Sequence, residues 1–533
     1  MARDHWYVIE KDEQTEVLDG DKKVVQAFSV SENLPRALEL LREFNKIKDT
    51  QGNALCTHFL YRGISLWSFH QEVIFWKYFR YFAKYEMIYR FFSTIIDKPS
   101  VIHVDETSAE LRTILEIILQ FRVARPYQNT ITKKLKKLSL KLCALCVSIL
   151  AISKMMIKKN IPIIYSPDNY SNVGCDFRIY PLYKYMWGKK KDYVEIFHTN
   201  WGENFLKNLF KRKKVALYLE SLVWGSLALP TSMPQADFKE VPSHVGLFYS
   251  SVLSQLGRMM GKSFQLLPRL EKILSWTSIP TIVALDDVRY TNELIMACRE
   301  NNIKIYGLQH GQFTKYHVGW MNYDLPLDRS VTFDTLFVWN EFWKNMLLRY
   351  SSQYTSQNVE IGGWLRKLPD FVVQKKIASE SSLSFLIPYE ISLSKNVLKK
   401  YIRKFLDLGC TIYFKVRPDL SQEDQKQTYG FLSSDNVIIV KQIDAEVLGK
   451  IDAVVGVYST FLSEMIYYEK PIIQIDCSFD LGHYLKDEHL ATQLSPDFTR
   501  QHLQDIIENF HSVKAVVWPP SKDINTLFAE LIP

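Results

Sequence analysis

Along most of the chain, short runs of apolar residues alternate with longer stretches in which apolar residues recur every three or four positions. The short runs are typical of strands buried on both faces, and the longer stretches are typical of helices that pack along one face. The alternation starts near residue 159, and a polar, serine-bearing stretch at 375–384 interrupts it. Alternating strands and helices predict a parallel, doubly wound sheet. We therefore expect an α/β protein with two Rossmann-like halves joined by a linker.

Each half has its own series of predicted elements. In the first half we expect strands at 161–166, 193–197, 281–285, 303–308, 335–339 and 359–363, with helices at 179–187, 213–224, 247–276 and 292–300. In the second half we expect strands at 383–387, 411–416, 437–440, 453–457 and 472–475, with helices at 395–408 and 461–468. The predicted domains are residues 159–370 and 371–533. Ligands of such folds bind beyond the carboxyl ends of the strands, so we expect the halves to face each other across a ligand-binding cleft.

Residues 1–158 have a different pattern, and we expect them to form a mixed, largely helical extension. The sequence Asp19-Gly20-Asp21 lies between two strand-like pieces and predicts a hairpin, because Asp-Gly accepts the positive φ of a tight turn. The same residues spell an Asp-x-Asp metal-binding signature. The turn is preferred because lysines follow at once and no buried strand leads into it. A strand or turn is expected at 60–67 and a mostly buried helical segment at 70–96.

The composition favours a folded protein. The chain has 533 residues, of which 47% are hydrophobic and 23% are charged, which suits two or three domains and argues against a disordered chain. Seven cysteines form no paired framework, and the start of the chain lacks the apolar core of a signal peptide, so we expect a cytoplasmic location. Cys143 and Cys146 lie inside an apolar helical run, and we interpret them as packing residues in preference to a zinc or redox pair.

Positive charge is concentrated around one apolar segment. The formal net charge is +8, and eight lysines lie within 133–159, on both sides of the apolar run 142–153. That run is shorter than the roughly 20 residues that cross a bilayer, so we do not expect a transmembrane span. It is either a helix lying in an anionic membrane surface, to which the basic run 211–214 would add, or a core helix with a solvated lysine face. The aromatic residues cluster in apolar company, as at 75–82, so we do not expect nucleic-acid binding.

Polar residues follow the strand predicted at 453–457. Ser459 and Thr460 stand at the start of the next helix, and Glu464 lies about one turn further along it. The two hydroxyls and the first N–H groups of the helix would converge on a phosphate, and Glu464 would accept hydrogen bonds from a ribose. Ser and Thr are also the ordinary capping residues of a core helix. Both interpretations of this turn stay open.

Other predicted strands end in polar clusters too. These are Asp286-Asp287 with Arg289, Gln309-His310-Gly311, and Arg417-Pro418 together with the Tyr458-Ser459-Thr460 turn, and further cleft candidates are Gly363 and Tyr389. The first half thus offers an imidazole and carboxylates, whereas the second offers a cation and a helix N-terminus, and this division suits group transfer. The sequence contains neither a Gly-x-Gly-x-x-Gly nor a Walker A motif, and it lacks metal-ligand spacing, so we expect neither a cofactor nor a metal.

The order of these motifs resembles one family. The segments that carry the resemblance are Leu308-Gln309-His310-Gly311, Phe385-Leu386-Ile387-Pro388-Tyr389, Lys415-Val416-Arg417-Pro418, and Tyr458-Ser459-Thr460 with Glu464 and Lys470-Pro471-Ile472-Ile473, together with Asp176-Phe177-Arg178-Ile179 and Tyr193-Val194-Glu195. They look like the bacterial surface-polysaccharide glycosyltransferases of the GT-B fold, namely the capsule Kdo and sialic-acid-type transferases and the related teichoic-acid glycerophosphotransferases. The resemblance covers roughly residues 160–480.

The resemblance implies roles for particular residues. His310 matches the family's catalytic base, and Ser459 and Thr460 match its phosphate-binding hydroxyls. The family's His-Pro motif falls on Arg417-Pro418, and arginine can bind a phosphate there but cannot act as an acid. Asp286-Asp287 approaches the acidic element of the sialyltransferase members, although Val288 replaces its glycine. A CMP-linked acidic sugar, such as Kdo or a nonulosonic acid, is the implied donor.

These observations lead us to expect a metal-independent glycosyltransferase that builds a surface glycan at the inner face of the cytoplasmic membrane. His310, Asp286 or Asp287 would deprotonate the acceptor hydroxyl, and Arg417 and the Thr460 region would neutralise the phosphate leaving group. The expected partners are a nucleotide-activated sugar, a glycan or lipid-linked glycan acceptor, and a membrane surface that residues 133–159 contact. Rivals with the same fold are a polyol-phosphate transferase and a sugar-nucleotide 2-epimerase. A rival of another class is a non-catalytic scaffold that binds a membrane or a partner enzyme.

Overall fold

The structure is a computed structural model, and it divides into two compact units. It describes residues 5–11, 14–30, 33–94, 101–104, 111–112, 115, 122–123, 130–167, 174–198, 215–223, 235–286, 289–321, 325, 331–365, 368–371, 383–390, 395–416, 436–475, 484–518 and 523–532. The first unit comprises residues 1–30, 35–366 and 521–533, and the second comprises 31–34 and 367–520. The boundary lies close to the one predicted at 370/371. Apart from residues 31–34, residues 1–158 belong to the first unit, and so do the last residues of the chain.

A seven-stranded sheet forms the centre of the first unit. Its strands are β8 (Ile163–Pro167), β9 (Val194–His198), β10 (Ala216–Tyr218), β11 (Thr281–Leu285), β12 (Lys304–Leu308), β13 (Thr335–Val338) and β14 (Val359–Ile361). They lie in the order β10-β9-β8-β11-β12-β13-β14, and all neighbours are parallel. Counted along the chain, this order is 3-2-1-4-5-6-7, which is the Rossmann order with one strand added.

The second unit repeats this arrangement with six strands. They are β15 (Ser384–Pro388), β16 (Thr411–Lys415), β17 (Val437–Val440), β18 (Ala453–Gly456), β19 (Ile472–Ile475) and β20 (Thr492–Leu494). Their order is β17-β16-β15-β18-β19-β20, again with parallel neighbours, which is 3-2-1-4-5-6 along the chain. The predicted α/β class with two Rossmann-like halves is confirmed. That the halves face each other across a cleft stays a prediction.

The helices follow from the sequence pattern with a few corrections. The first unit contains α1 (Leu34–Asn45), α2 (Gln71–Ile74), α3 (Arg80–Thr94), α5 (Thr130–Ile157), α6 (Tyr180–Gly188), α8 (Ser243–Ser275), α9 (Thr291–Glu300), α10 (Val318–Met321), α11 (Glu341–Tyr350) and α19 (Ile524–Leu531). Short 3-10 or π segments are η2 (Leu55–Thr57), η3 (Ser68–His70), η4 (Phe75–Phe79), η5 (Phe177–Ile179) and η6 (Leu219–Leu222). The second unit contains α12 (Lys395–Asp407), α14 (Ala445–Lys450), α15 (Thr460–Tyr467), α16 (Tyr484–Asp487), α17 (Arg500–Glu508) and α18 (Lys514–Val517).

The N-terminal region packs onto the first sheet's helices. Its mixed sheet has the order β3-β2-β1-β6-β7, built from β1 (His5–Lys11), β2 (Gln14–Leu18), β3 (Val24–Ser29), β6 (Val101–Val104) and β7 (Arg122–Val123), and a small hairpin joins β4 (Leu60–Tyr61) to β5 (Ile64–Ser65). Helix α8 meets α3 and η4 through rings that pack within about 4 to 6 Å of each other: Phe79 and Phe82 contact Phe248, and Phe44 contacts Tyr249. This aromatic contact holds the N-terminal region in the same unit as the seven-stranded sheet.

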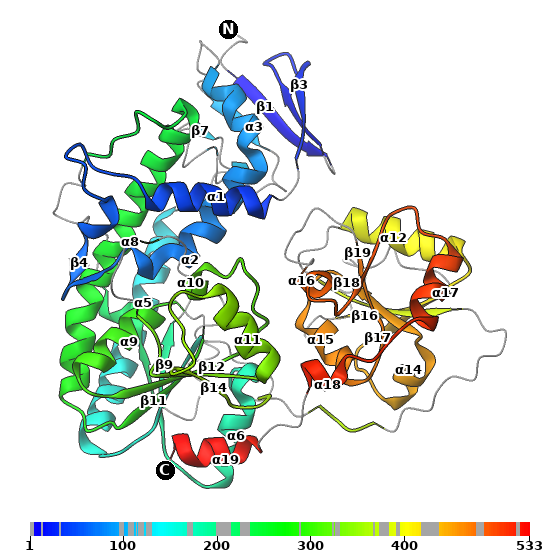
Figure 1. Ribbon diagram of the computed structural model, residues 1–533. Coiled ribbons are helices and arrows are strands. Elements are labelled where there is room, and N and C mark those ends of the chain that lie inside the picture. Colours follow the sequence, from blue (N-terminus) through cyan, green and yellow to red (C-terminus); the bar gives the residue numbers. More distant parts are fainter. Residues whose placement is uncertain are drawn as a thin grey trace. The chain divides into compact units, whose positions relative to one another are not determined.

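The end of the chain returns to the first unit. Helix α19 lies beside α6 (Figure 1), where Phe528 packs against Tyr185 with ring centroids 5.8 Å apart. The Lys191 amine donates a hydrogen bond to the carbonyl oxygen of Ile532 at 2.7 Å. The C-terminal segment is therefore part of the first unit's packing, which the predicted boundary at 371–533 does not anticipate.

Three local predictions need correction. The helix predicted at 213–224 is wrong, because Ala216–Tyr218 forms β10 and is buried between neighbouring elements. Cys143 and Cys146 do not pack in the core, since both are exposed. The hairpin at Asp19-Gly20 is confirmed, but the left-handed residue of its turn is Lys22, with φ of 60°. The linker predicted at 375–384 and the basic run 211–214 lie mainly outside the described residues.

Helix α5 is longer than the sequence argument allowed. It has 28 residues, and its stretch Leu138–Ile157 is long and apolar enough, by length and composition, to cross a membrane, with 28% of the stretch buried. The length argument against a span is therefore wrong. One face of the helix packs on β10 and η6 through the buried residues Leu140, Ala144 and Ser148. This packing is what an amphipathic helix on a sheet shows.

Candidate functional site

The first sheet reverses its strand order between β8 and β11, and the polar residues gather at the carboxyl edge of this switch point. Asp286 follows β11 directly, and His310 follows the neighbouring strand β12 by two positions. The Tyr165 hydroxyl, on β8, donates a hydrogen bond to the carbonyl oxygen of Arg289, which links the two strands of the switch point. Ligands of doubly wound sheets bind at this position. The predicted cluster is therefore placed where a site is expected.

Asp286 holds His310 in place. The carboxylate is fully buried, its Oδ1 accepts a hydrogen bond from the backbone N–H of His310 at 3.0 Å, and the same oxygen contacts the ring nitrogen Nδ1 of His310. The His310 side chain keeps 19% of its surface exposed. A carboxylate on Nδ1 fixes the tautomer that leaves Nε2 as the proton-accepting nitrogen. Within the described residues, the second oxygen of Asp286 has no hydrogen-bond partner.

Gln309 shapes the turn that carries His310. Its side-chain oxygen accepts a hydrogen bond from the N–H of Trp339 at 2.9 Å, and its amide donates to the carbonyl oxygen of Gly311 at 2.8 Å. The indole N–H of Trp339 donates to the Gln309 carbonyl oxygen at 2.8 Å. Gln309 is fully buried, so it ties β12 to β13 and is not a ligand-facing group. At Gly311 there is room for a side chain, because an added methyl group would meet no atom of the described residues within 4 Å. Of the two predicted glycines, Gly311 and Gly363, only Gly363 has a positive φ, at 84°.

Two partly buried histidines lie in the same unit. Burial, followed by the positive charge of His310, lowers the pKa of His317 to about 4, and its Nδ1 accepts a hydrogen bond from the N–H of Thr314 at 3.0 Å. Burial, followed by the charges of Arg289 and Arg178, lowers the pKa of His198 to about 4. Both rings are therefore neutral near pH 7. Asp176 and Arg178, from the segment resembling the family, form an ion pair at 2.6 Å and cap η5.

The switch point of the second sheet lies between β15 and β18, and a buried carboxylate occupies it as well. Glu390 follows β15, and it accepts hydrogen bonds from the backbone N–H groups of Val457, Tyr458 and Ser459 at 2.8, 2.7 and 3.1 Å. Burial raises the pKa of Glu390, and the three N–H bonds oppose that rise. These three N–H groups belong to the turn before α15, so Glu390 does not occupy the first N–H groups of the helix, which the sequence offers to a phosphate.

The remaining residues of the predicted phosphate site lie on α15. The Ser459 oxygen accepts a hydrogen bond from the N–H of Phe461 at 3.3 Å, which makes Ser459 the helix cap. Thr460 begins the helix and Glu464 follows in its second turn, both half-buried. Tyr389 is half-buried at the end of β15, with its N–H bonded to the Lys415 carbonyl oxygen. A phosphate role for Ser459, Thr460 and Glu464 stays a prediction.

Three predicted site residues lie outside the described residues, namely Asp287, Arg417 and Pro418. Arg289 is described and exposed, at the start of α9. In the described part of the chain, no three His, Cys, Asp or Glu side chains form a group that could hold a metal ion.

Glu390 is the site residue that the sequence reasoning missed. It directly follows Tyr389, which was a candidate, and it ends the first strand of the second Rossmann series. An acidic residue at the end of a first strand was the available signal, because that strand borders the switch point.

Comparison with known proteins gives only distant similarities. The sequence matches no protein-family model and no curated protein. Among solved structures, the chain is similar to the UDP-GlcNAc 2-epimerase from Methanocaldococcus jannaschii, with 13% identity and a TM-score of 0.40 over 70% of this chain and 99% of that one. It is similar to MurG of Acinetobacter baumannii, with 10% identity and a TM-score of 0.42 over the same shares. It is also similar to CalG4, the calicheamicin glycosyltransferase, with 10% identity and a TM-score of 0.39 over 70% of this chain and 95% of that one. Similarity this weak carries no argument about activity, and the fold rests on the strand order described above.

Proposed function

We propose that the protein is a GT-B-type glycosyltransferase, which moves a sugar from a nucleotide donor to a growing surface glycan. The observation that supports this proposal best is the Asp286–His310 pair at the switch point of one Rossmann-ordered sheet, in a chain with a second sheet of the same order. A base oriented by a buried carboxylate suits the activation of an acceptor hydroxyl. The second sheet has the strand order of nucleotide-binding sheets, which suits the binding of a nucleotide-linked donor.

In the proposed reaction, Nε2 of His310 takes the proton of the acceptor hydroxyl. The acceptor oxygen then forms a bond to the anomeric carbon of the donor sugar, and the bond from that carbon to the phosphate oxygen breaks. The bonding electrons leave with the nucleotide phosphate, and Asp286 stabilises the imidazolium that forms on His310. Protein groups of the second unit, Arg417 and the Thr460 region, stabilise the leaving phosphate without a metal.

The finer identity of the donor is also a proposal. A CMP-linked acidic sugar, Kdo or a nonulosonic acid, is favoured by the motif resemblance described above. Because Glu390 accepts the N–H bonds of residues 457–459, the turn before α15 is closed, and the donor phosphate would be bound at Ser459 and Thr460, with Glu464 on the ribose. The proposed location is the cytoplasm, at the inner face of the membrane.

The test begins with thermal unfolding of the protein with CMP, CDP, UDP, GDP and their sugar conjugates. A bound ligand stabilises the folded state by about 2.7 kcal/mol at a hundredfold excess over its Kd. The stabilising donor is then used in transfer assays with a panel of oligosaccharide acceptors. His310→Ala should lower the transfer rate by roughly 10²–10⁴-fold, since positioned acid–base groups contribute that much. His511→Ala, an exposed histidine of the second unit, is the matched control.

The same assays separate the rivals. A 2-epimerase would convert the sugar nucleotide without an acceptor, and a polyol-phosphate transferase would release CMP from CDP-glycerol and leave phosphate in the product. A scaffold would be stabilised by no nucleotide. Transfer at an unchanged rate in His310→Ala would remove His310 from the mechanism.

We further propose that α5 contacts an anionic membrane surface. Opposite its buried face, six large apolar side chains are between 47% and 80% exposed: Leu138, Leu142, Ile149, Leu150, Met156 and Ile157. The helix contains no Asp or Glu, and the segment 133–159 has eight lysines, two of which, Lys154 and Lys158, pair with Asp192. An apolar face bordered by lysines complements a surface of anionic lipid.

Vesicle sedimentation tests this contact. The protein should bind phosphatidylglycerol vesicles and bind phosphatidylcholine vesicles weakly. Leu150→Glu should lower binding by about tenfold or more, because one buried leucine side chain contributes roughly 1.5–3 kcal/mol. Val516→Glu, an equally exposed apolar position in the second unit, should leave binding unchanged. Equal loss in both variants would contradict a specific role for α5.

A further inference from the structure

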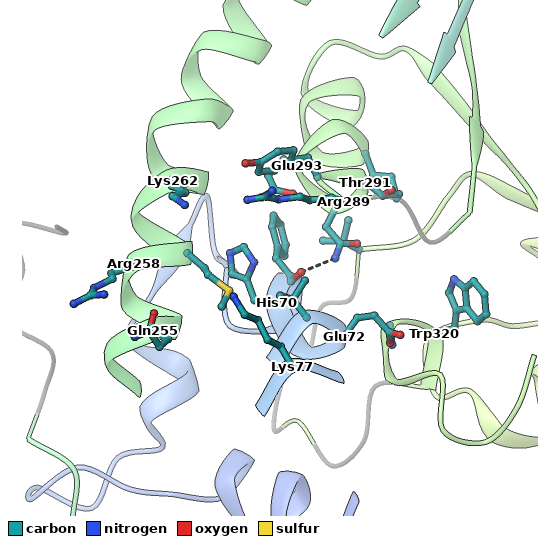
Figure 2. Close-up of a pocket in the computed structure, with 18 of the residues that line it drawn as sticks. His70, Glu72, Lys77, Gln255, Arg258, Lys262, Arg289, Thr291, Glu293 and Trp320 are labelled. Atoms are coloured by element: carbon teal, nitrogen blue, oxygen red, sulfur yellow. Dashed lines mark hydrogen bonds between the residues drawn. The ribbon is translucent and has the colours of Figure 1, made fainter. Parts of the chain in front are cut away.

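A cavity of about 530 Å³ lies in the first unit, between the N-terminal region and the sheet's helices. Its walls come from η3, α2 and η4, from the middle of α8, from the start of α9 and from α10 (Figure 2). We call it the α8–α9 cavity. Its volume falls within the range of small-molecule sites, about 300–1,000 Å³. The proposed function does not yet use it.

Four cationic side chains line the α8–α9 cavity, against two carboxylates. The cations are Lys77, Arg258, Lys262 and Arg289, and the carboxylates are Glu72 and Glu293. In the described part of the chain, Lys77, Arg258 and Arg289 form no ion pair. In Figure 2 the side chains of Lys77 and Arg289 extend into the space between the elements, whereas Arg258 points away from it. The lining of the cavity therefore has an excess of positive charge.

The two carboxylates are already engaged. Glu72 accepts hydrogen bonds from the N–H of Gly319 at 2.6 Å and from the indole of Trp76. Glu293 is buried, and its Oε1 lies 2.5 Å from the Ser263 hydroxyl, which also contacts the Nε2 of His70 at 3.1 Å. These bonds fix both carboxylates within the walls, and burial raises the pKa of Glu293, which weakens its negative charge beside the cations.

The pKa of His70 is affected by two of the cations that line the cavity. Burial, followed by the charges of Arg289 and Lys262, lowers the pKa of the His70 imidazole to about 3. The ring is therefore neutral near pH 7. Arg289 and Lys262 both line the cavity with His70, so positive charge faces this ring from two of its walls.

The cavity adjoins the Asp286–His310 pair. Arg289 and the first turn of α9 come directly after β11, and the residue between them, Tyr290, has a φ of 67°, which is rare for a bulky residue and typical of functional sites. On the other wall, Trp320 stacks on His317 with ring centroids 5.1 Å apart. His317 in turn lies close enough to His310 for their charges to interact. The lining includes neither Asp286 nor His310, so an acceptor bound in the cavity would have to extend from it toward the proposed base.

The lining combines cations with aromatic faces. Trp320, Tyr78 and Tyr290 contribute rings to the walls. The apolar C–H face of a pyranose packs well on such rings, while carboxylates and phosphates form charge-assisted hydrogen bonds with Lys and Arg. A neutral sugar would use only the rings, and a simple anion would use only the cations.

We propose that the α8–α9 cavity is the acceptor subsite, and that the acceptor it binds is an anionic saccharide, one that carries a carboxylate or a phosphate. The inference deepens the proposed function and rests on it. It also gives residues 70–78 of the N-terminal region a role, because they form one wall of the acceptor subsite.

The test uses the full-length protein without donor and isothermal titration calorimetry with three probes. These are a trisaccharide of galacturonic acid, the neutral trisaccharide of galactose with the same linkages, and glucose 6-phosphate. The acidic trisaccharide should bind at least about tenfold more tightly than the neutral one, since charge-assisted hydrogen bonds are lost in the latter. If glucose 6-phosphate binds more tightly than the acidic trisaccharide, phosphate is the recognised group, and the reverse order identifies carboxylate.

Variants assign the binding to the cavity. Arg289→Gln and Lys262→Gln should each weaken binding of the tighter probe by roughly tenfold, and weaken it more together. Arg299→Gln removes a cation from the exposed far end of α9 and should leave affinity unchanged. Circular dichroism melts of each variant check folding. If neither the acidic trisaccharide nor glucose 6-phosphate binds more tightly than the neutral trisaccharide, or if Arg289→Gln leaves the affinity unchanged, the inference is overturned.

The outcome is distinguishable from failure of the proposed function. If a nucleotide sugar stabilises the protein and His310→Ala blocks transfer, while no anionic probe binds, the acceptor inference fails and the transferase stands. If anionic probes bind and no nucleotide sugar does, the cavity is confirmed as an anionic-saccharide site and the transferase proposal fails.

Discussion

At the switch point of the first sheet, Asp286 is fully buried and holds an imidazole that keeps 19% of its surface exposed. At the equivalent point of the second sheet, Glu390 is also buried, but it holds three backbone N–H groups of residues 457–459. Both carboxylates follow a strand of a Rossmann-ordered sheet. One orients a group that reaches solvent, and the other closes a turn.

The two carboxylates therefore have different structural roles, although the sheets are similar. A carboxylate that orients a side chain can prepare it for chemistry. A carboxylate that saturates backbone donors fixes a loop and leaves recognition to neighbouring side chains. Under the proposed function, the first unit would supply the acid–base group, whereas the second unit has a closed turn before α15. The predictions below test this division.

The largest expected effect comes from replacing each carboxylate by its amide. Asp286→Asn should lower the transfer rate by roughly 10²–10⁴-fold, because the amide no longer stabilises an imidazolium on His310. Glu390→Gln should lower it far less, since Glu390 touches backbone. The measurement is kcat for both variants with the donor identified by thermal unfolding. Equal losses would mean that the two switch points do not divide the chemistry.

The sequence predicts the two sheets well because buried parallel strands read as continuous apolar runs. The runs at 281–285 and 453–457 illustrate this, since four or more of their residues are buried. The short strand β10 was missed because three residues give little periodicity. The polar clusters at His310 and Ser459 were visible because each directly follows its strand.

The contacts that complete the sites could not be predicted from local patterns. Glu390 meets the turn of β18 across 67 to 69 positions of the chain, and only the strand order brings them together. The α8–α9 cavity joins residues near 70, 258 and 290 for the same reason. Its N-terminal wall depends on the packing of η4 against α8. The sequence shows the aromatic residues of η4 but does not indicate which helix they pack against.

The second prediction concerns the stability of the turn. Glu390→Ala leaves one buried and two partly buried N–H groups without an acceptor, and an unsatisfied buried group costs about 1–3 kcal/mol, so the free energy of unfolding should fall by about 2 kcal/mol or more. Glu390→Gln should cost less, because its amide oxygen still accepts. Urea unfolding of both variants measures this. A loss below 1 kcal/mol for Glu390→Ala would show that the turn does not depend on the carboxylate.

The third prediction uses three buried or partly buried histidines of the first unit. His70, His198 and His317 have pKa values lowered to about 3, 4 and 4, against about 6.5 in the unfolded chain. The unfolded state therefore binds more protons below pH 6.5, and stability falls as pH falls through this range. The three together should cost on the order of 2 kcal/mol at pH 6 relative to pH 8.

The described histidines of the second unit are exposed, so that unit should be less affected. Hydrogen exchange followed by mass spectrometry, with rates corrected for intrinsic pH dependence, separates the two units. Peptides from β11 and β12 should lose protection between pH 8 and pH 6, and peptides from β18 and β19 should not. Loss of protection in both units to the same degree would contradict the assignment to these three histidines.

The smallest expected effect separates a cap from a phosphate ligand. Ser459 caps α15 in the second unit, and Asn340 caps α11 in the first, where its side chain accepts a hydrogen bond from the N–H of Trp343 at 3.3 Å. Ser459→Ala and Asn340→Ala should each lower the free energy of unfolding by about 1 kcal/mol, as the loss of a cap does. If Ser459 only caps its helix, both variants keep the nucleotide Kd of the parent protein. If it binds the donor phosphate, Ser459→Ala raises that Kd severalfold while Asn340→Ala leaves it unchanged, and the turn that Glu390 closes then also serves recognition.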